Sequence, residues 1–176
     1  MNIWHDISDN RITEDKFLSV IEISKNGKVK YELDKLSGYL RMDRVLYTST
    51  HYPANYGFIP RTYCDDNDPL DVLVLCNEEL VPMSICECKP IGVLIMTDNN
   101  EQDEKIISVA INDPNMNVYN DISELPEHIF AEMKHFFRVY KELEGKTTVV
   151  DEILGANEAK KIILRSKESY KKLFSK

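Results

Sequence analysis

The chain has 176 residues, of which 43% are hydrophobic, and its 22 basic and 30 acidic side chains give a formal net charge of −8. This length is typical of a single domain, and the apolar content excludes a disordered chain. The negative charge argues against binding to duplex nucleic acid or to an anionic membrane, and no apolar run approaches the roughly 18 residues that a membrane span needs.

The N-terminal segment MNIWHDISDNR has no basic region followed by an apolar stretch, so we expect no signal peptide and a cytoplasmic protein. The cysteines fit this compartment as free thiols, since none of them forms a CxxC pair. A zinc site is the alternative, but the cysteine spacing fits no common zinc pattern. The cysteines are Cys64, Cys76, Cys86 and Cys88.

The first two-thirds of the chain is predicted to form β-strands joined by turns. Residues 28–33 alternate between apolar and polar side chains, which is the period of a half-buried strand. Asn26-Gly27, just before them, predicts a hairpin turn. Pro90 and Gly92 predict a bulge or bend within a long strand. The predicted strands span residues 17–23, 28–33, 39–47, 72–76, 85–96 and 105–111.

Two amphipathic helices are predicted in the last third of the chain. Ser123 and Pro126 are start signals for the first helix, Gly145 is its stop signal, and Asn157 can cap the second. Short strands followed by helices favour an α+β fold that is mainly β, with a closed or near-closed small barrel and two packed helices. Apolar residues recur at helical spacing on one face of each helix. They are Ile129, Met133, Phe136, Phe137, Tyr140 and Leu143 in the first, and Ala159, Ile162, Ile163, Tyr170, Leu173 and Phe174 in the second.

The negative charge is concentrated in one segment. Between Thr62 and Glu104, eleven acidic residues accompany a single base, Lys89, so this segment carries −10 and the rest of the chain carries +2. Local acidity of this kind is typical either of a solvated loop face or of a site that holds cations.

The sharpest motif lies inside the acidic segment. Asp66, Asp68 and Asp71 fall within six residues, and crowded carboxylates repel one another unless cations or solvent offset their charge. Pro69 favours an extended conformation at Asp68, which lets Asp66 and Asp68 project the same way toward hard divalent cations. An EF-hand is excluded, because its sixth position, counted from Asp66, is Asp71 instead of glycine, and its twelfth is Asn77 instead of glutamate.

Three further carboxylates are candidates for the same site. Asp98 and Asp103 lie at the turn between two predicted strands, where a polar hairpin loop is the simpler interpretation. Glu22 interrupts the apolar strand VIEI, where a charge without a partner is costly. An edge position that faces water explains Glu22 equally well.

Cationic and phenolic side chains accompany these acids. Each of them alone is consistent with a solvated strand face or a helix end. The aromatic-rich segment HYPANYGFIP predicts a structured loop that places Tyr56 beside the acids. Carboxylates for metal ions, combined with Lys and Arg for an anion, indicate a metal-bound phosphate substrate. The cationic and phenolic candidates are Lys30, Arg44, Tyr140 and Lys141.

In these motifs the sequence resembles the soluble inorganic pyrophosphatases of the first family, of the small bacterial type. That family's acid-x-acid-Pro-apolar-acid signature is present as DNDPLDV at residues 66–72, and the resemblance extends from about Phe17 to the C-terminal helix. The motifs VIEI, KYELD, MDR, YPANYGFIP, IGVLIMTD and HFFRVYKELE follow in the family's order. The resemblance implies a single pyrophosphatase domain over residues 1–176, with an OB-like five-stranded closed β-barrel and two packed α-helices.

The resemblance also implies the roles of the site residues. Asp68 would be the general base, and Tyr56 would hydrogen-bond near the nucleophile. The substrate would be pyrophosphate, and the cofactor would be Mg²⁺, with several ions per site and Mn²⁺ as an alternative. The implied metal-binding residues are Asp66, Asp71, Asp98, Asp103 and Glu22, and the implied substrate-binding residues are Lys30, Arg44, Tyr140, Lys141, Lys105 and Glu32.

The last third departs from the family pattern. Bacterial members often form a hexamer through two histidines of the first helix, and here His135 is present but Val139 occupies the second place. A tryptophan common in the family near Thr147 is also absent. The resemblance therefore implies a homo-oligomer, a hexamer, with an altered contact. Two other functions stay open: a cation-binding barrel without hydrolytic activity, and an OB-type nucleic-acid module, which the acidic segment disfavours.

Overall fold

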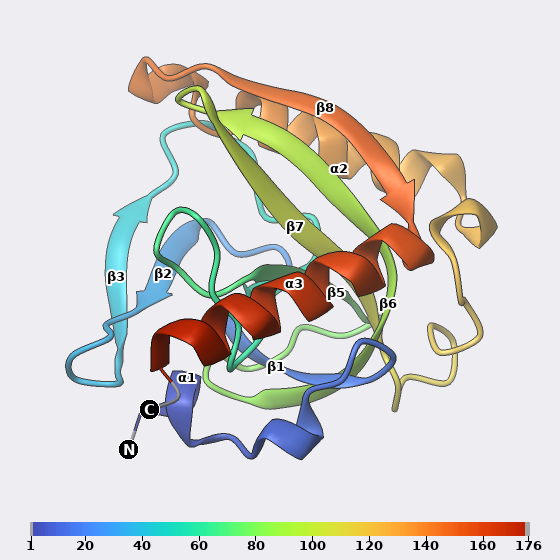
Figure 1. The fold of residues 1–176 in the computed structure, drawn as a ribbon. Helices are drawn as coiled ribbons and strands as arrows, with labels where there is room; N and C mark the ends of the chain where they lie inside the picture. The colour runs from blue at the N-terminus through green and yellow to red at the C-terminus, as the bar shows by residue number, and fades with distance from the viewer. Residues whose placement is uncertain (1, 175–176) are drawn as a thin grey trace.

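The structure, a computed structural model, describes residues 2–174 and is built around a ring of five strands (Figure 1). The strands pair in the order β1, β4, β5, β7 and β6, and β6 pairs back with β1 to close the ring. Only the β5–β7 pair is parallel among these five contacts. This confirms the five-stranded closed barrel. The ring strands are β1 (Phe17–Ile23), β4 (Asn55–Phe58), β5 (Asp71–Leu75), β6 (Ile85–Asp98) and β7 (Glu101–Ala110).

Two features of the sequence let the ring close. All residues of β1 are buried, which its apolar run predicts, and a Cβ atom at Gly57 of β4 would lie 1.8 Å from the backbone oxygen of Val20. Only glycine therefore permits the close pairing of β1 and β4. In β6 the register shifts between Pro90 and Gly92, which confirms the predicted bend.

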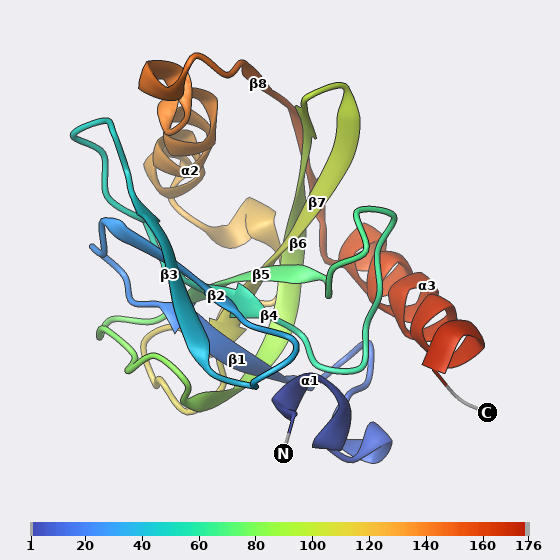
Figure 2. The ribbon, with the colours of Figure 1, turned by 90° about the vertical axis from the view of Figure 1, so that its left-hand side faces the viewer.

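A separate hairpin stands beside the ring (Figure 2). It consists of β2 (Val29–Leu33) and β3 (Leu40–Val45), which pair only with each other. Asn26 does adopt a left-handed turn conformation, with φ of 65°. However, the expected pairing across this turn is wrong, because β4 and β6 already occupy the edges of β1.

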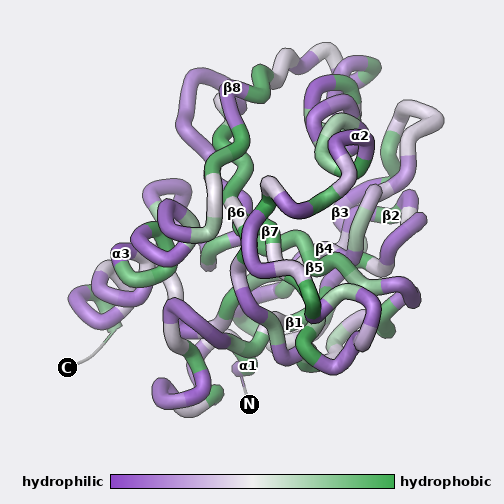
Figure 3. Tube along the Cα trace, turned by 90° about the vertical axis from the view of Figure 1, so that its right-hand side faces the viewer, coloured by the Kyte–Doolittle hydropathy of each residue, from purple (hydrophilic) through white to green (hydrophobic). Residues whose placement is uncertain are grey.

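Two long helices cover opposite faces of the layer formed by β6, β7 and the added strand β8 (Thr148–Gly155) (Figure 2). Leu94 and Met96 of β6 share a core cluster with α2 (Glu127–Val139), whereas the alternate residues Val93 and Ile95 share one with α3 (Ala156–Phe174). This alternation is the two-residue period of a strand buried on both faces. Hydrophilic and hydrophobic segments alternate along α2 and α3, as expected for helices with one buried face (Figure 3).

Three residues predicted on the apolar helix faces are exposed instead. Leu143 is 67% exposed, because α2 ends at Val139 and the chain turns into the 3₁₀ helix η3 (Glu142–Glu144). Leu173 and Phe174 lie in the last turn of α3 and are 53% and 40% exposed. The other predicted face residues of α3 are buried, from Ala159 to Tyr170.

Several elements were not expected from the sequence. Strand β4 falls in the segment predicted as a loop, and the edge strand β8 has no clean alternation of apolar side chains. The short helices are α1 (Ile3–Asp6), η1 (Asp9–Arg11) and η2 (Ile122–Glu124). No helix within residues 2–174 has the length and apolar content of a membrane span.

Candidate active site

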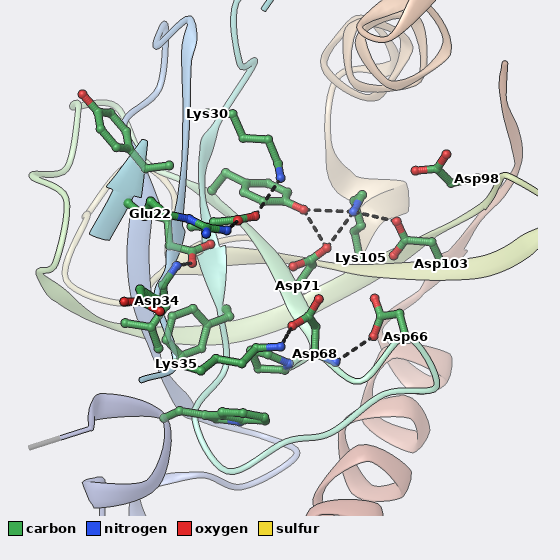
Figure 4. A pocket seen from close by; sticks show the side chains of 18 of the residues that line it. Glu22, Lys30, Asp34, Lys35, Asp66, Asp68, Asp71, Asp98, Asp103 and Lys105 are labelled. Atoms are coloured by element: carbon green, nitrogen blue, oxygen red, sulfur yellow. Dashed lines mark hydrogen bonds and ion pairs between the residues drawn. The ribbon is translucent and has the colours of Figure 1, made fainter. Parts of the chain in front are cut away.

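A pocket of about 460 Å³ opens between the β2–β3 hairpin, the ring strands and the end of α2 (Figure 4). It brings together twelve of the thirteen predicted site residues. The thirteenth, Arg44, does not line the pocket but lies next to it, because it pairs in register with the lining residue Lys30 and contacts Asp43. The predicted residues that line the pocket are Glu22, Lys30, Glu32, Tyr56, Asp66, Asp68, Asp71, Asp98, Asp103, Lys105, Tyr140 and Lys141.

Lys105 forms the centre of the pocket floor (Figure 4). Parallel pairing of β5 with β7 places Asp71 opposite Lys105. The Nζ atom of Lys105 donates to Asp71 Oδ2 at 2.7 Å, to Asp103 Oδ2 at 3.0 Å and to the Tyr56 hydroxyl at 2.9 Å. Burial disfavours the ammonium, but the charges of Asp103 and Asp71 outweigh it and raise the pKa of Lys105 well above its usual value. Lys105 is therefore a fixed positive charge.

The phenol of Tyr56 belongs to the same network. Its hydroxyl donates to Asp71 Oδ2 over 2.6 Å, from a strand in place of the expected loop. Burial, reinforced by the charge of Asp71, raises the pKa of Tyr56 well above its usual value, so the phenol keeps its proton. Asp71 is thus held by Tyr56 and Lys105 together.

The acidic motif forms a tight loop at the pocket mouth. Asn67 adopts a left-handed conformation, with φ of 67°, and the backbone N–H of Asp68 donates to Asp66 Oδ1 at 3.1 Å. Burial, together with the charges of Asp71 and Asp68, raises the pKa of Asp66 to about 6. The loop therefore holds carboxylates whose mutual repulsion a bound cation would relieve.

The turn between β6 and β7 presents the second pair of acids. Asn99 and Asn100 both have positive φ, 51° and 65°, which is the geometry of a tight two-residue hairpin turn. Asp98 and Asp103 flank this turn and both line the pocket. The simpler interpretation of a polar hairpin loop that faces solvent does not account for their position in the pocket. Burial raises the pKa of Asp103, although Lys105 opposes the shift.

Glu22 does not face water. Its side chain is buried, and Oε1 accepts a hydrogen bond of 2.7 Å from the backbone N–H of Leu33. Burial raises the pKa of Glu22 to about 8, and the charge of Asp71 adds to the shift. Without a cation in the pocket, Glu22 is therefore protonated near neutral pH.

This shift predicts how stability depends on pH. Between the unfolded pKa of Glu22 and its raised folded pKa, only the folded state holds the proton, so stability falls as pH rises from about 5 to about 9. We expect Glu22→Gln to reduce that loss by on the order of 3 kcal/mol. Urea denaturation in excess chelator, at several pH values, measures the free energy of unfolding of each variant. Glu78→Gln, at an exposed glutamate, is the control. If the free energy of unfolding depended on pH equally in both variants, the raised pKa of Glu22 would be contradicted.

The cations at the rim are each paired with a carboxylate. Lys30 contacts Glu32 and Asp43 at 3.2 Å each, and Lys141 contacts Asp98. Arg44 Nε lies 2.8 Å from Glu144 Oε1, and Asp98 Oδ1 is buried without a hydrogen-bond partner. These ion pairs hold the cations close to the pocket, and carboxylate oxygens such as Asp98 Oδ1 can still accept a further bond.

Sequence reasoning missed several residues of this region. Asp43 and Glu144 fix Arg44, and Lys35 contacts Asp68. Trp4 lines the pocket from α1. Apart from Asp43, which directly precedes Arg44, these contacts join distant parts of the sequence: Glu144, for example, is a hundred residues away from Arg44.

The donor set of the pocket fits hard divalent cations. Asp66, Asp71, Asp98 and Asp103 offer carboxylate oxygens, the ligands that Mg²⁺ and Mn²⁺ prefer, and the unpartnered Asp98 Oδ1 is available for coordination. Across residues 2–174, no three His, Cys, Asp or Glu side chains already converge on one point. Lys105 separates Asp71 from Asp103 here.

A closed barrel whose pocket combines carboxylates with lysine side chains is typical of the class of proteins that bind phosphate together with metal ions. The family model for inorganic pyrophosphatase matches residues 19–171. The chain belongs to the inorganic pyrophosphatase family.

Relatives and solved structures agree with this assignment. The chain is 50% identical to soluble inorganic pyrophosphatase 2 of Chlamydomonas reinhardtii, covering 95% of this chain and 87% of the relative. It is 49% identical to the soluble inorganic pyrophosphatase of Zea mays, with 95% and 78% covered. The structure of the Helicobacter pylori inorganic pyrophosphatase has a TM-score of 0.88 at 41% identity, covering 91% of this chain and 96% of that one. The structure of the Thermus thermophilus inorganic pyrophosphatase has a TM-score of 0.91 at 34% identity, covering 97% of this chain and 99% of that one.

Proposed function

We propose that this protein hydrolyses inorganic pyrophosphate to two phosphates, with Mg²⁺ as cofactor and Mn²⁺ as an alternative. The observation that carries the proposal is the combination, in one pocket, of acids suited to metal ions and cations suited to phosphate. Its membership of the pyrophosphatase family supports the same activity.

Asp66, Asp71, Asp98 and Asp103 would hold the metal ions, with Glu22 close by. Bound metal ions neutralise the charge of the substrate and lower the pKa of water. Tyr56 and Lys105 keep Asp71 in one orientation through the bonds of 2.6 and 2.7 Å described above. The protein thus fixes its ligands before the cations arrive.

The remaining residues act on the substrate and on the proton. Lys30, Arg44, Tyr140 and Lys141 bind the phosphate oxygens, with Lys105 and Glu32 beside them, and they stabilise the charge that develops on the departing phosphate. Water forms a bond to one phosphorus while the bridging P–O bond breaks. Asp68, at the pocket mouth, takes the proton of the water as general base.

Substrate preference tests this proposal. In Mg²⁺, we expect phosphate release from pyrophosphate to be faster than from ATP, because Lys30, Lys105 and Lys141 line one small pocket and would bind a compact pair of phosphates. Phosphate release by the purified protein from each substrate, at equal concentration, measures the preference. A preference for ATP would indicate a general phosphohydrolase and contradict the proposal.

We propose also that the protein works in the cytoplasm as a homo-oligomer, a hexamer. Four free cysteines support a reducing compartment. Exposure of His128 and His135 on the outer side of α2 supports a contact there. Because Val139 replaces the second histidine, side chains other than a histidine pair would have to form that contact.

A further inference from the structure

Lys35 lies in the loop that joins β2 to β3, at the edge of the pocket (Figure 4). The loop is closed by hydrogen bonds of 2.8 Å from the N–H of Asp34 to the oxygen of Tyr39 and from the N–H of Gly38 to the oxygen of Asp34. The Asn2 side chain donates to the Lys35 carbonyl oxygen at 2.9 Å. The backbone of Lys35 is therefore fixed on both sides.

The ammonium of Lys35 is also fixed, by three groups from two segments. It forms an ion pair with Asp68, donates to the carbonyl oxygen of Asn67 at 3.1 Å, and lies 5.6 Å from the ring centroid of Trp4. Trp4 is buried, and its Nε1 donates to the oxygen of Thr62 at 2.9 Å, so the ring is a rigid support.

We infer that Lys35 is a positioning residue for hydrolysis, which fixes the carboxylate of Asp68 at the mouth of the pocket. The inference rests on the proposed function, in which Asp68 is the general base. Lys35 acts through Asp68 and does not contact the reacting atoms.

The contacts distinguish this arrangement from an ordinary surface ion pair. Lys35 and Asp68 retain 43% and 51% of their side-chain exposure, and exposed pairs alone contribute little to stability. Here the same ammonium binds the carbonyl of Asn67, whose left-handed conformation sets the direction of the following residue. It therefore holds both the side chain of Asp68 and the loop that carries it.

The placement has a catalytic reason. A general base acts efficiently only when its carboxylate lies within hydrogen-bond reach of the proton that it abstracts, and small misplacements are costly. The side chain of Asp68 is itself half exposed, and its ion pair is with Lys35. Lys35, which lies against the ring of Trp4, restricts the carboxylate from the side opposite to Asp66 (Figure 4).

A double-mutant cycle tests the inference. We expect Lys35→Met to lower the kcat for pyrophosphate about 10-fold with an unchanged KM, and to cause no further loss in an Asp68→Asn background. Lys35→Arg, which keeps the charge and the donors, is expected to restore most of the kcat. Lys161→Met, at an exposed lysine of α3 that pairs with Glu158 and with no other acid among residues 2–174, is the matched control. Thermal denaturation confirms that each variant is folded.

Each alternative outcome overturns the inference. A rise in KM with unchanged kcat would assign Lys35 to substrate binding. An equal loss of kcat in both backgrounds would show that Lys35 does not act through Asp68. If Asp68→Asn is fully active, the role of Asp68 fails together with this inference, whereas pyrophosphate hydrolysis by the wild-type protein stands.

Discussion

Replacing Asp68 with asparagine is expected to lower the turnover of pyrophosphate hydrolysis roughly 10²–10⁴-fold, which is the range for loss of a general base. Asparagine has the size of aspartate but cannot take a proton at neutral pH. The side chain of Asp68 is half exposed, and its backbone N–H, which binds Asp66, is unchanged by the substitution. The fold should therefore survive. Phosphate release under saturating substrate measures the loss, and thermal denaturation checks the fold.

Asp65→Asn is the matched control for this experiment. Asp65 lies in the same acidic loop and is exposed, but it does not line the main pocket. The two variants change the net charge by the same amount, so a general electrostatic effect would appear in both. Undiminished hydrolysis by a folded Asp68→Asn protein would contradict the assignment of Asp68 as the base.

Replacing Lys105 with methionine is expected to destabilise the metal-free protein by about 3 kcal/mol. The substitution keeps the length of the buried stem but removes the charge that separates Asp71 from Asp103. These carboxylates retain about a quarter of their exposure, so solvent offsets part of the repulsion. Urea denaturation in excess chelator measures the change in the free energy of unfolding.

Added Mg²⁺ should stabilise Lys105→Met more than it stabilises the wild-type protein, because the cation would replace the missing positive charge. Lys89→Met is the control, since this strand lysine donates only to the neutral oxygens of Asn117 and Asn120. We expect it to cost about 1 kcal/mol. Equal loss in both variants, without a larger effect of Mg²⁺ on Lys105→Met, would contradict the account of the pocket floor.

The barrel could be predicted where a strand is a nearly continuous apolar run, as in β1, all of whose residues are buried. The alternation of residues 28–33 correctly predicts a strand, β2, but that strand lies in the separate hairpin and its burial does not alternate. Strand β4 could not be predicted in this way, because it is four residues long and depends on Gly57 lying against β1. The partners of β1, which are β4 and β6, could not be predicted from the Asn26-Gly27 turn either, because a turn fixes only the local direction of the chain, whereas pairing in a closed ring depends on the whole sheet.

The site could be predicted to the extent that its residues lie in recognisable motifs. Crowding in the acidic loop indicates cations without any structure, and the other acids, cations and phenols are candidates from their places in the strands and the helix. The family resemblance adds Lys105, Glu32 and the role of each residue. The partners that orient these residues could not be predicted. Lys35 depends on Trp4, and Arg44 depends on Glu144, and these are contacts between distant segments that tertiary packing alone creates.

The most direct measurement is the rate of phosphate release from pyrophosphate by the wild-type protein, in Mg²⁺ and in excess chelator. Since the acids of the pocket are suited to metal ions, we predict a rate in Mg²⁺ that exceeds the rate in chelator by more than about 10²-fold, which corresponds to several kcal/mol of transition-state stabilisation. Equal rates under the two conditions, or no release in Mg²⁺, would contradict the central claim that this pocket hydrolyses pyrophosphate with metal ions.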